Sequence, residues 1–585
     1  MQQIKNNKQK QTILLLAGII ILQILMLLRC FYDIETLDEA YYLAETRLVL
    51  NGAVPYAFNN QSSSGFTFLI LPFLKVYQLI CPALEGVFLY MRICFWAWRL
   101  ILWIITYIVL KKHFAKDRLL LAILILTPFW GIFVPAFSYN TISMWLIFLV
   151  GVINIAALNE HEQKNIYLDA VISGILMALA VFAHPAQALN VFLVGVLLLY
   201  YTKKKKIQTI ILYALSGISV VGVVLCIAMQ AGTDHLMNGL EIIFGGEPAL
   251  APVPIAAAIK HLLSQMKTMI IVMLVSIVIC YLFCYFFKKD GLEHEKGKYY
   301  IINGLAAGTI VNLIISLVRD SADSYIGGSS ILLSIGTVAF MWLLGFSIIS
   351  MKTQDRLLYW FIMIPPLLLF VINGFFAWCD IYLRMSEFIF VLFGVILILP
   401  DYIQSDNLKH RVFHYGYYII VFGTVFLLLK SDFGYVYLGE QWNKCTTQIE
   451  SGIYKGMFTT KEKNKDITEL EKYIHEITES DERILFRDIA PMAYLMSDGI
   501  ACTPTAWDTI QYMFGGKDDR VMQLYFKNID AVPDKIIYID TEFVEGLSIE
   551  SDDFPFNQFV NDNYSYVGER DFGEEYRVVC YEKND

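Results

Sequence analysis

Four acidic residues follow the first long apolar segment of the chain, in the stretch RCFYDIETLDEAYYLAETRLVLNGAVPY, residues 29–56. They are Asp33, Glu35, Asp38 and Glu39. A carboxylate beside a hydroxyl group can act as a general base, because it takes the proton from the attacking oxygen. Charged residues at a membrane span are costly and usually mark a function. This stretch is therefore the first place where we expect chemistry.

Asp38 and Glu39 begin a predicted helix that ends at the Asn-Gly pair 51–52. One face of this helix is apolar at helical spacing, and a second face carries Asp38, Tyr42 and Glu45. A solvated acidic loop is the alternative interpretation. We favour an amphipathic helix on the outer membrane surface, with Tyr41 and Tyr42 as weaker candidates for contact with a substrate.

The composition indicates a membrane protein with a soluble, acidic tail. Of 585 residues, 57% are hydrophobic and 17% are charged, more apolar surface than a soluble domain can hide. Residues 431–585 hold 31 Asp and Glu against 15 Lys and Arg, a net charge of −16. The whole chain carries −9, which leaves about +7 for residues 1–430. We predict a polytopic helical domain over 1–430 and a separate soluble domain over 431–585.

Apolar runs of about 20 residues can cross the roughly 30 Å hydrocarbon core of a bilayer. The predicted spans are 12–30, 86–110, 119–136, 140–157, 167–183, 187–201, 207–230, 266–287, 299–318, 329–350, 357–377, 386–401 and 414–430, about 13 in all. With a cytoplasmic N-terminus, nearly every Lys and Arg cluster of this domain falls in an inner loop. The first outer segment, 31–85, and the C-terminal domain are then extracytoplasmic. Residues 62–80 are apolar enough to be a span, but counting them as one would move the Lys cluster 203–206 to the outer side of the membrane. We therefore expect them to lie along the outer surface.

The tail has its own pattern of helices and strands. Residues 467–478 have the spacing of a helix, and 534–540 read as a buried strand. A short strand is expected within DERILFRD, a short helix within PMAYLMSDG, and a closing hairpin over 564–582. Strands separated by helices predict an α/β domain.

The order of motifs in the first 115 residues resembles that of the GT-C glycosyltransferases. The likeness is carried by DEAYY after the first span, by GAVPY at the close of the helix, and by a second span that ends in LKKHF. The pattern is most similar to the bacterial protein-mannosyltransferase-like branch, which uses polyprenyl-phosphate sugars. One departure concerns NNQSSSGF, which stands where many relatives have an HPP-like motif. Residues 1–430 fit the 11–13 spans of the family.

The resemblance implies an inverting transfer of a sugar from a polyprenyl phosphate to a hydroxyl group. The acceptor would be a wall glycopolymer, a lipid-linked glycan or a protein on the outer face of a bacterial plasma membrane. Asp38 matches the family's first-loop Asp, which implies the role of general base. Glu39 is expected to help it, by orienting the acceptor or by binding a metal. Asp33 and Glu35 do not match the motif, and we expect them to be surface charge.

A leaving phosphate needs a cation or oriented donors beside it. The outer side offers Lys75, Arg92, Arg319 and Arg384. We favour Arg384 and then Arg319 as donor-phosphate-binding residues. The alternatives are snorkelling to lipid headgroups, expected for Lys75, or an ion pair of Arg384 with Glu387.

Four further residues are weaker candidates for substrate binding. Tyr139 and Asn140 lie in a polar turn, which explains them equally well. His184 precedes a proline at a span end, where a hydrogen-bonded structural histidine is the more common case. Glu247 lies in the Gly- and Pro-rich loop 244–254, which suits a lid.

The cysteines have no metal-ligand spacing, and the residues indicate no cofactor. The family resemblance leaves a divalent cation open, because members with and without a metal are known. Two other functions compete with the transferase. A transporter or flippase of lipid-linked glycan would show charges in mid-membrane and internal repeats, and the chain has no repeat. A membrane-anchored scaffold that works through its tail would leave DEAYY unexplained.

Overall fold

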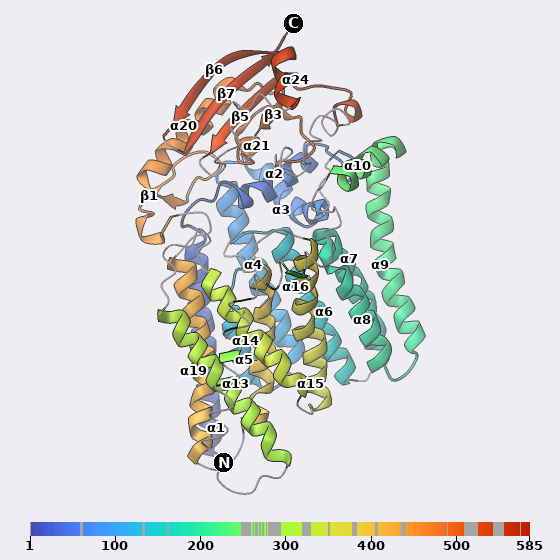
Figure 1. The fold of residues 1–585 in the computed structure, drawn as a ribbon, viewed down its shortest axis with the longest axis vertical. Coiled ribbons are helices and arrows are strands. Elements are labelled where there is room, and N and C mark those ends of the chain that lie inside the picture. Colours follow the sequence, from blue (N-terminus) through green and yellow to red (C-terminus); the bar gives the residue numbers. More distant parts are fainter. Residues whose placement is uncertain are drawn as a thin grey trace.

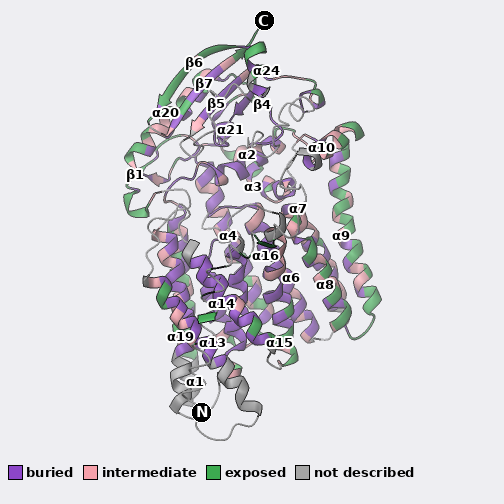
Figure 2. Ribbon diagram, viewed as in Figure 1, coloured by how far each residue is buried: buried purple, intermediate pink, exposed green. Residues whose placement is uncertain are grey.

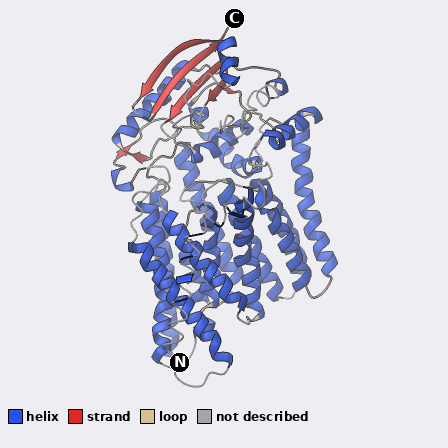
Figure 3. Cartoon of the chain, viewed as in Figure 1, coloured by secondary structure: helices blue, strands red, loops and turns tan. Residues whose placement is uncertain are grey.

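The protein is built in three layers, which the computed structural model shows stacked along its long axis (Figures 1 and 3). Membrane helices form the layer that contains the N-terminus. The segment between helix α1 (Gln2–Arg29) and helix α4 (Val87–Leu110) forms the middle layer, and a domain with a β-sheet contains the C-terminus. The structure describes the chain except residues 1, 59–62, 132–134, 161–162, 247–258, most of 261–293, 319–328, 349–350, 377–382, 404–407, 435–439, 488–489, 508–524, 542–554, 574 and 585.

The described residues include eight helical segments that are long and apolar enough to cross a membrane, and four shorter apolar ones. The prediction of a multi-pass helical membrane protein is therefore confirmed, while the predicted span 266–287 lies mostly outside the described residues. After α1 and α4 the membrane elements are α5 (Lys116–Leu126), α6 (Tyr139–Glu160), α7 (Gln163–Ala183), η2 (Pro185–Gln187), α8 (Ala188–Tyr201), α9 (Lys206–Ala228), η3 (Met229–Ala231), α10 (Thr233–Gly246), α13 (His294–Val318), α14 (Ser329–Ile348), α15 (Thr353–Leu358), η5 (Tyr359–Met363), α16 (Ile364–Phe376), η6 (Leu383–Phe388), α17 (Ile389–Ile398), α18 (Pro400–Ile403) and α19 (Leu408–Gly434).

One predicted span is wrong in its extent. The segment 119–136 does not form a continuous helix, because α5 ends at Leu126, two residues before Pro128. Pro128 has no backbone N–H to donate to the carbonyl of Leu124, and its ring would clash with that carbonyl, so a regular helix does not continue through it. Arg99 of α4 then covers the open end of α5, since its Nη2 donates to the carbonyls of Leu126, Thr127 and Phe129 at 3.3, 2.7 and 2.5 Å.

The centre of the helical layer is formed by α5, α6 and α17, which are buried almost throughout (Figure 2). Trp145 and Phe148 of α6 pack against Phe390 of α17 with ring centroids 5.0 and 4.5 Å apart. The outer helices α1 and α9 instead expose apolar side chains such as Leu14 and Ile218. An exposed apolar face of this kind fits a lipid environment, because lipid needs no polar surface.

Three of the predicted inner segments meet at the end of the bundle that holds the N-terminus (Figure 1). Arg118, in the first turn of α5, pairs with Asp401 at 2.5 Å, and Lys352 lies 3.6 Å from the same carboxylate. Gln354 donates to the carbonyl oxygen of His113. These three segments, which the sequence assigns to one side of the membrane, therefore share one side in the structure.

The middle layer contains α2 (Asp38–Leu50), η1 (Ser64–Phe66) and α3 (Thr67–Ile80). Helix α3 lies at the level of α2, between the long helices and the C-terminal domain (Figure 1), as expected for a segment at the membrane surface. Gly65 allows η1 to press against the end of α7. A Cβ atom at this position would lie 2.5 Å from the Cβ and the carbonyl oxygen of Phe182.

The C-terminal domain is an α/β domain, as predicted. Its five-stranded sheet has the order β4-β3-β5-β7-β6, in which β3 pairs in parallel with β4 and β5, and the other pairs are antiparallel. The elements are β1 (Thr447–Gln448), β2 (Phe458–Thr459), α20 (Lys461–Ile477), β3 (Arg483–Arg487), α21 (Ala493–Met496), β4 (Ile500–Ala501), β5 (Lys535–Thr541), α24 (Pro555–Asn563), β6 (Tyr564–Phe572) and β7 (Tyr576–Lys583). The predicted helix, strands and closing hairpin all form.

Candidate active site

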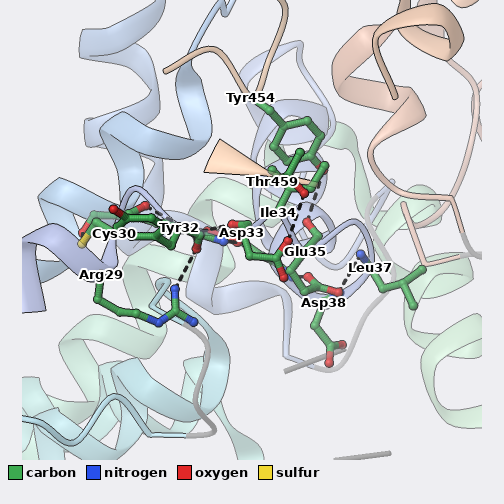
Figure 4. A network of polar contacts seen from close by, with 12 residues as sticks. Arg29, Cys30, Tyr32, Asp33, Ile34, Glu35, Leu37, Asp38, Tyr454 and Thr459 are labelled. Atoms are coloured by element: carbon green, nitrogen blue, oxygen red, sulfur yellow. Dashed lines mark hydrogen bonds and ion pairs between the residues drawn. The ribbon is translucent and has the colours of Figure 1, made fainter. Parts of the chain in front are cut away.

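The first turn of α2 is held in place by the side chain of Glu35 (Figure 4). Glu35 Oε1 accepts hydrogen bonds from the backbone N–H groups of Leu37 at 2.8 Å and Asp38 at 3.0 Å, and Oε2 accepts from Glu39 at 2.5 Å. N–H groups at the start of a helix have no partner within the helix, and a carboxylate there is favoured by the helix dipole. Glu35 is buried. The expectation that it is surface charge is wrong.

Burial also changes the ionisation of Glu35. It raises the pKa of the carboxyl group to about 8, and the nearby Asp38 carboxylate acts in the same direction. The hydrogen bonds from the backbone of Glu39 and Leu37 lower the pKa, but by less. The charges of Glu35 and Asp38 are therefore linked, because an ionised Asp38 favours a neutral Glu35.

Glu39 forms a buried ion pair with Arg92 of α4. Arg92 Nε donates to Glu39 Oε1 at 2.7 Å and Nη2 to Oε2 at 2.5 Å, with both side chains at most 1% exposed. The remaining nitrogen, Nη1, donates to the carbonyls of Cys30, Tyr32 and Asp33. These bonds place Arg92 inside the protein, bound to Glu39 and to the α1–α2 connection, and not at a site for a leaving phosphate.

Asp33 links the α1–α2 connection to the C-terminal domain, and the expectation that it is surface charge is also wrong. It is fully buried. Its Oδ2 accepts the backbone N–H of Glu440 at 2.6 Å, and its Oδ1 accepts the hydroxyl of Thr459 at 3.2 Å. Its own N–H donates to the carbonyl of Phe458 at 2.7 Å. The partners lie more than 400 residues later in the chain, so no local pattern reveals them.

The C-terminal domain also holds the second half of α2. Glu45 Oε1 accepts the backbone N–H of Ala506 at 2.7 Å and the hydroxyl of Thr505. Arg47 donates to the carbonyls at the end of α21, those of Tyr494, Leu495 and Ser497, at 2.7, 2.9 and 3.1 Å. Helix α2 is therefore fixed at its start by Glu35 and Arg92 and along its length by the C-terminal domain.

Of the acids in residues 31–56, Asp38 is the one that is half-exposed, while Asp33, Glu35, Glu39 and Glu45 are buried. Its side chain points away from Asp33 and Glu35 in the close view (Figure 4). A half-exposed carboxylate on a rigidly held helix can accept a proton from a hydroxyl group that binds beside it.

Tyr42, one helical turn after Asp38 on α2, belongs to an aromatic cluster that brings together several of the predicted candidates. The ring centroids of Tyr42 and Tyr139 are 5.8 Å apart, and those of Tyr139 and His184 are 5.3 Å apart. Phe66 lies 5.6 Å from Tyr42. On the other side, Tyr41 contacts Tyr42 at 5.2 Å and Trp507 of the C-terminal domain at 5.4 Å. The cluster therefore contains side chains from both domains.

The remaining candidates are placed only in part. Arg384 lies in η6, but its side chain is not among those described, and Arg319 and Glu247 lie outside the described residues. Lys75 is exposed on α3, which fits a snorkelling lysine. Asn140 is half-buried at the start of α6, where its carbonyl accepts the hydroxyl of Ser143 at 3.0 Å.

The sequence did not reveal a buried polar cluster that lies about one helical turn from Tyr139 and His184. It consists of Ser143 on α6, Gln187 on η2, Asn190 on α8 and Glu387 on η6. Gln187 Nε2 donates to Glu387 Oε1 at 3.2 Å and to Ser143 Oγ at 3.4 Å. The polar residues of HPAQALN, which recur at helical spacing in an apolar segment, were the available signal. Among the described residues, no group of three or more His, Cys, Asp or Glu could hold a metal ion.

Comparison with known proteins finds similar solved structures but no matching family model. No family model and no curated protein matches the chain. The crystal structure of ArnT from Cupriavidus metallidurans in the apo state aligns over 98% of both chains, with 12% sequence identity and a TM-score of 0.41. The same protein bound to undecaprenyl phosphate aligns over 97% of both chains, with 10% identity and a TM-score of 0.41. Values this low carry no argument about the chain.

Proposed function

We propose that this protein is a membrane glycosyltransferase. It transfers a sugar from a polyprenyl phosphate to a hydroxyl group of a cell-envelope acceptor, which is a wall glycopolymer, a lipid-linked glycan or a protein. The reaction takes place at the outer face of a bacterial plasma membrane, with the N-terminus in the cytoplasm. One observation carries the proposal: Asp38 is the half-exposed acid on a helix whose other acids are buried and paired.

This arrangement is costly to build. Burial of the Glu39–Arg92 pair removes two charges from water, and such pairs contribute little net stability. What the pair does contribute is a fixed position for the first turn of α2. A fixed carboxylate is what general base catalysis needs, because proton transfer depends on the distance between base and hydroxyl.

The proposed reaction is a single displacement. The Asp38 carboxylate takes the proton of the acceptor hydroxyl, and the hydroxyl oxygen forms a bond to the anomeric carbon of the sugar. The bond between this carbon and the phosphate oxygen breaks, and polyprenyl phosphate leaves with the electron pair. Attack opposite to the leaving group inverts the anomeric configuration. A proton and a sugar have then moved, and no oxidant or reductant is needed.

The other proposed roles follow from position. Glu39 acts on the reaction through Arg92, by orienting the turn that carries Asp38. Tyr42, Tyr139 and His184 surround the sugar or the acceptor, with Tyr41 and Asn140 at the edge of this group. Arg384 and Arg319 remain the proposed cations for the phosphate, and Glu247 the proposed contact from the loop 244–254. A divalent cation would bind the phosphate together with these arginines and would neutralise part of its charge.

The test is transfer in proteoliposomes that contain radiolabelled polyprenyl-phosphate sugars and an extract of cell-envelope acceptors. We expect Asp38→Asn to lower the rate of transfer by at least 100-fold, within the range that general base catalysis contributes. The matched control is Asp562→Asn, the same change at an exposed position of α24, which should transfer at the wild-type rate.

Two results would contradict the proposal. If Asp38→Asn transfers sugar as fast as the wild type at equal protein level, Asp38 is not the base. If the wild type turns over no sugar donor but moves labelled glycolipid across the bilayer, the protein is a flippase. The same vesicles serve both measurements, because enzymatic oxidation of exposed sugar reports the side on which the lipid lies.

A further inference from the structure

The polar cluster of Ser143, Gln187, Asn190 and Glu387 lies at the start of a membrane span, where charged groups are costly. Glu387 is 5% exposed and stands in the candidate span Met385–Tyr402. An ionisable side chain in such a place usually marks a functional site. The proposed chemistry at Asp38 does not use it.

A count of hydrogen bonds shows that the cluster has more acceptors than donors. Gln187 Nε2 donates to Glu387 and Ser143, and Asn190 Nδ2 donates to Gln187 Oε1 at 2.8 Å and to the carbonyl of Pro365 at 3.3 Å. Both amide groups have then used their N–H donors. Ser143 uses its hydroxyl hydrogen on the carbonyl of Asn140. Neither of the two amides nor the serine therefore has a donor left over among the described residues.

Two acceptors are left over among the described residues. Asn190 is fully buried, and its Oδ1 has no hydrogen-bond partner. The Glu387 carboxylate, which can accept about four hydrogen bonds, receives one, from Gln187. A buried acceptor without a donor costs about 1–3 kcal/mol. Among the described side chains, which do not include that of Arg384, the cluster therefore keeps unused acceptors that a molecule rich in donors can satisfy.

The cluster lies one helical turn from the aromatic cluster of the proposed active site. Ser143 follows Tyr139 by four residues on α6, so the two side chains share one face. Gln187 follows His184 by three residues, and η2 turns once between them. Tyr139, Asn140 and His184 are half-buried, while the four residues of the cluster are buried. Hydrogen bonds of Gln187 to Ser143 and to Glu387 then connect this face to Glu387.

We propose that Glu387 and Asn190 bind the sugar of the lipid-linked donor through the hydrogens of its hydroxyl or amino groups. This inference rests on the proposed function and names the residues that recognise the donor sugar. Gln187 holds Glu387 in position. A carboxylate and an amide oxygen accept several donors at once, and an amino sugar would also supply a positive charge to the buried carboxylate.

The test measures binding of the donor to the full-length protein in detergent, by the rise of its melting temperature. The probes are undecaprenyl phosphate, undecaprenyl-phosphate glucose and undecaprenyl-phosphate glucosamine. A ligand that binds the folded state raises the melting temperature with its concentration. We expect a sugar-bearing lipid to bind the wild type more tightly than bare undecaprenyl phosphate, and Glu387→Gln and Asn190→Leu to lose this difference by about 10- to 100-fold.

The variants separate the alternatives. If Glu387→Gln weakens binding of the glucosamine lipid alone, the partner of Glu387 is an ammonium group. If it weakens binding of the glucose and glucosamine lipids equally, the partners are hydroxyl groups. The control Glu450→Gln, at an exposed position, should bind as the wild type does. If Glu387→Gln and Asn190→Leu lower the melting temperature equally with and without sugar, the cluster holds a structural water, and the inference is wrong.

The result is also separate from that of the proposed function. Asp38→Asn should keep the tighter binding of the sugar-bearing lipid while it loses transfer. If sugar is transferred but binding does not depend on Glu387 and Asn190, recognition lies elsewhere and the proposed function stands. If no sugar-bearing lipid binds the wild type more tightly than bare lipid, the inference about Glu387 fails.

Discussion

The ion pair of Glu39 and Arg92 is the contact on which the first turn of α2 depends. Glu39→Gln would leave the guanidinium group of Arg92 buried without a counter-charge. Loss of one partner of a buried pair costs about 3–5 kcal/mol. We therefore expect Glu39→Gln to lower the free energy of unfolding by an amount of this order, measured by thermal or denaturant unfolding in detergent. Transfer should fall as the turn loses its position.

A second variant shows whether Glu39 acts by position or by chemistry. In the double variant Glu39→Gln with Arg92→Met, no unpaired charge remains, and stability should recover in part. The outcome that contradicts a positioning role is a Glu39→Gln protein of unchanged stability that transfers no sugar. Glu39 would then contact the reacting groups directly.

Glu35 should make the stability of the protein depend on pH. Its pKa is raised to about 8 in the folded state from about 4.5. Between these values the folded state holds a proton that the unfolded state has lost, so stability falls as the pH rises. The contribution is complete below about pH 4.5 and is lost as the pH passes through about 8. Its slope is at most about 1.4 kcal/mol per pH unit.

The measurement compares the melting temperature of the wild type and Glu35→Gln from pH 5 to pH 9. We expect the melting temperature of the wild type to fall relative to that of Glu35→Gln as the pH rises, because glutamine cannot lose a proton. A difference that stays constant over this range would show that Glu35 remains ionised, held by the three N–H groups of α2.

At the scale of single residues, local spacing located the start of α2 at Asp38 and Glu39 but did not reveal the burial of Asp33 and Glu35. Asp38 and Glu39 could be placed at the start of a helix from local spacing alone. Asp33 and Glu35 do not match the family motif, and the expectation that they are surface charge is wrong. Their burial depends on Glu440, Thr459 and the fold of α2, which no local pattern contains.

At the scale of elements, the contact of η1 with α7 positions the aromatic cluster. Gly65→Ala would place a Cβ atom 2.5 Å from backbone and side-chain atoms of Phe182, so η1 must move. Such overpacking costs about 1–3 kcal/mol. We expect a lower melting temperature and slower transfer, because Phe66 would shift relative to Tyr42.

The matched control for this change is Gly222→Ala on α9. A Cβ atom at Gly222 meets nothing within 4 Å, and alanine is favoured over glycine in a helix by up to about 1 kcal/mol. Gly222→Ala should therefore be neutral or slightly stabilising. A Gly65→Ala protein that melts and transfers like Gly222→Ala would show that η1 does not need this close approach.

The elements themselves were largely predictable, because apolar length and periodicity identify membrane helices and buried strands. The exception is α5. Its apolar segment is long enough to span, but Pro128 ends the helix and Arg99 covers the exposed carbonyls. Apolar content indicates burial in either case, and only the proline distinguishes a short buried helix from a span.

At the scale of the whole molecule, the two domains share one site. Asp33, Glu45 and Arg47 of the first outer segment bind backbone groups of the C-terminal domain, and Trp507 of that domain contacts Tyr41. The division at residue 430 separates a membrane domain from a soluble one in composition. It does not separate them in structure, since both domains contact α2.

The last prediction tests this dependence. In the double variant Glu45→Leu with Arg47→Met, α2 loses its bonds to Ala506 and to the carbonyls of Tyr494, Leu495 and Ser497. We expect amide hydrogen exchange in α2 to become at least 10-fold faster, since a factor of ten corresponds to about 1.4 kcal/mol of local stability. Transfer should fall with it, while exchange in the buried helix α17 stays unchanged.

The control is Lys455→Met, which removes an exposed ion pair with Glu85 at the rim of the same interface. Exposed pairs contribute little, so exchange in α2 and transfer should match those of the wild type. If exchange in α2 is equally slow in the Glu45 and Arg47 double variant, the membrane domain holds this helix by itself. The C-terminal domain would then take part in the site only through Trp507, and its role in fixing Asp38 would be wrong.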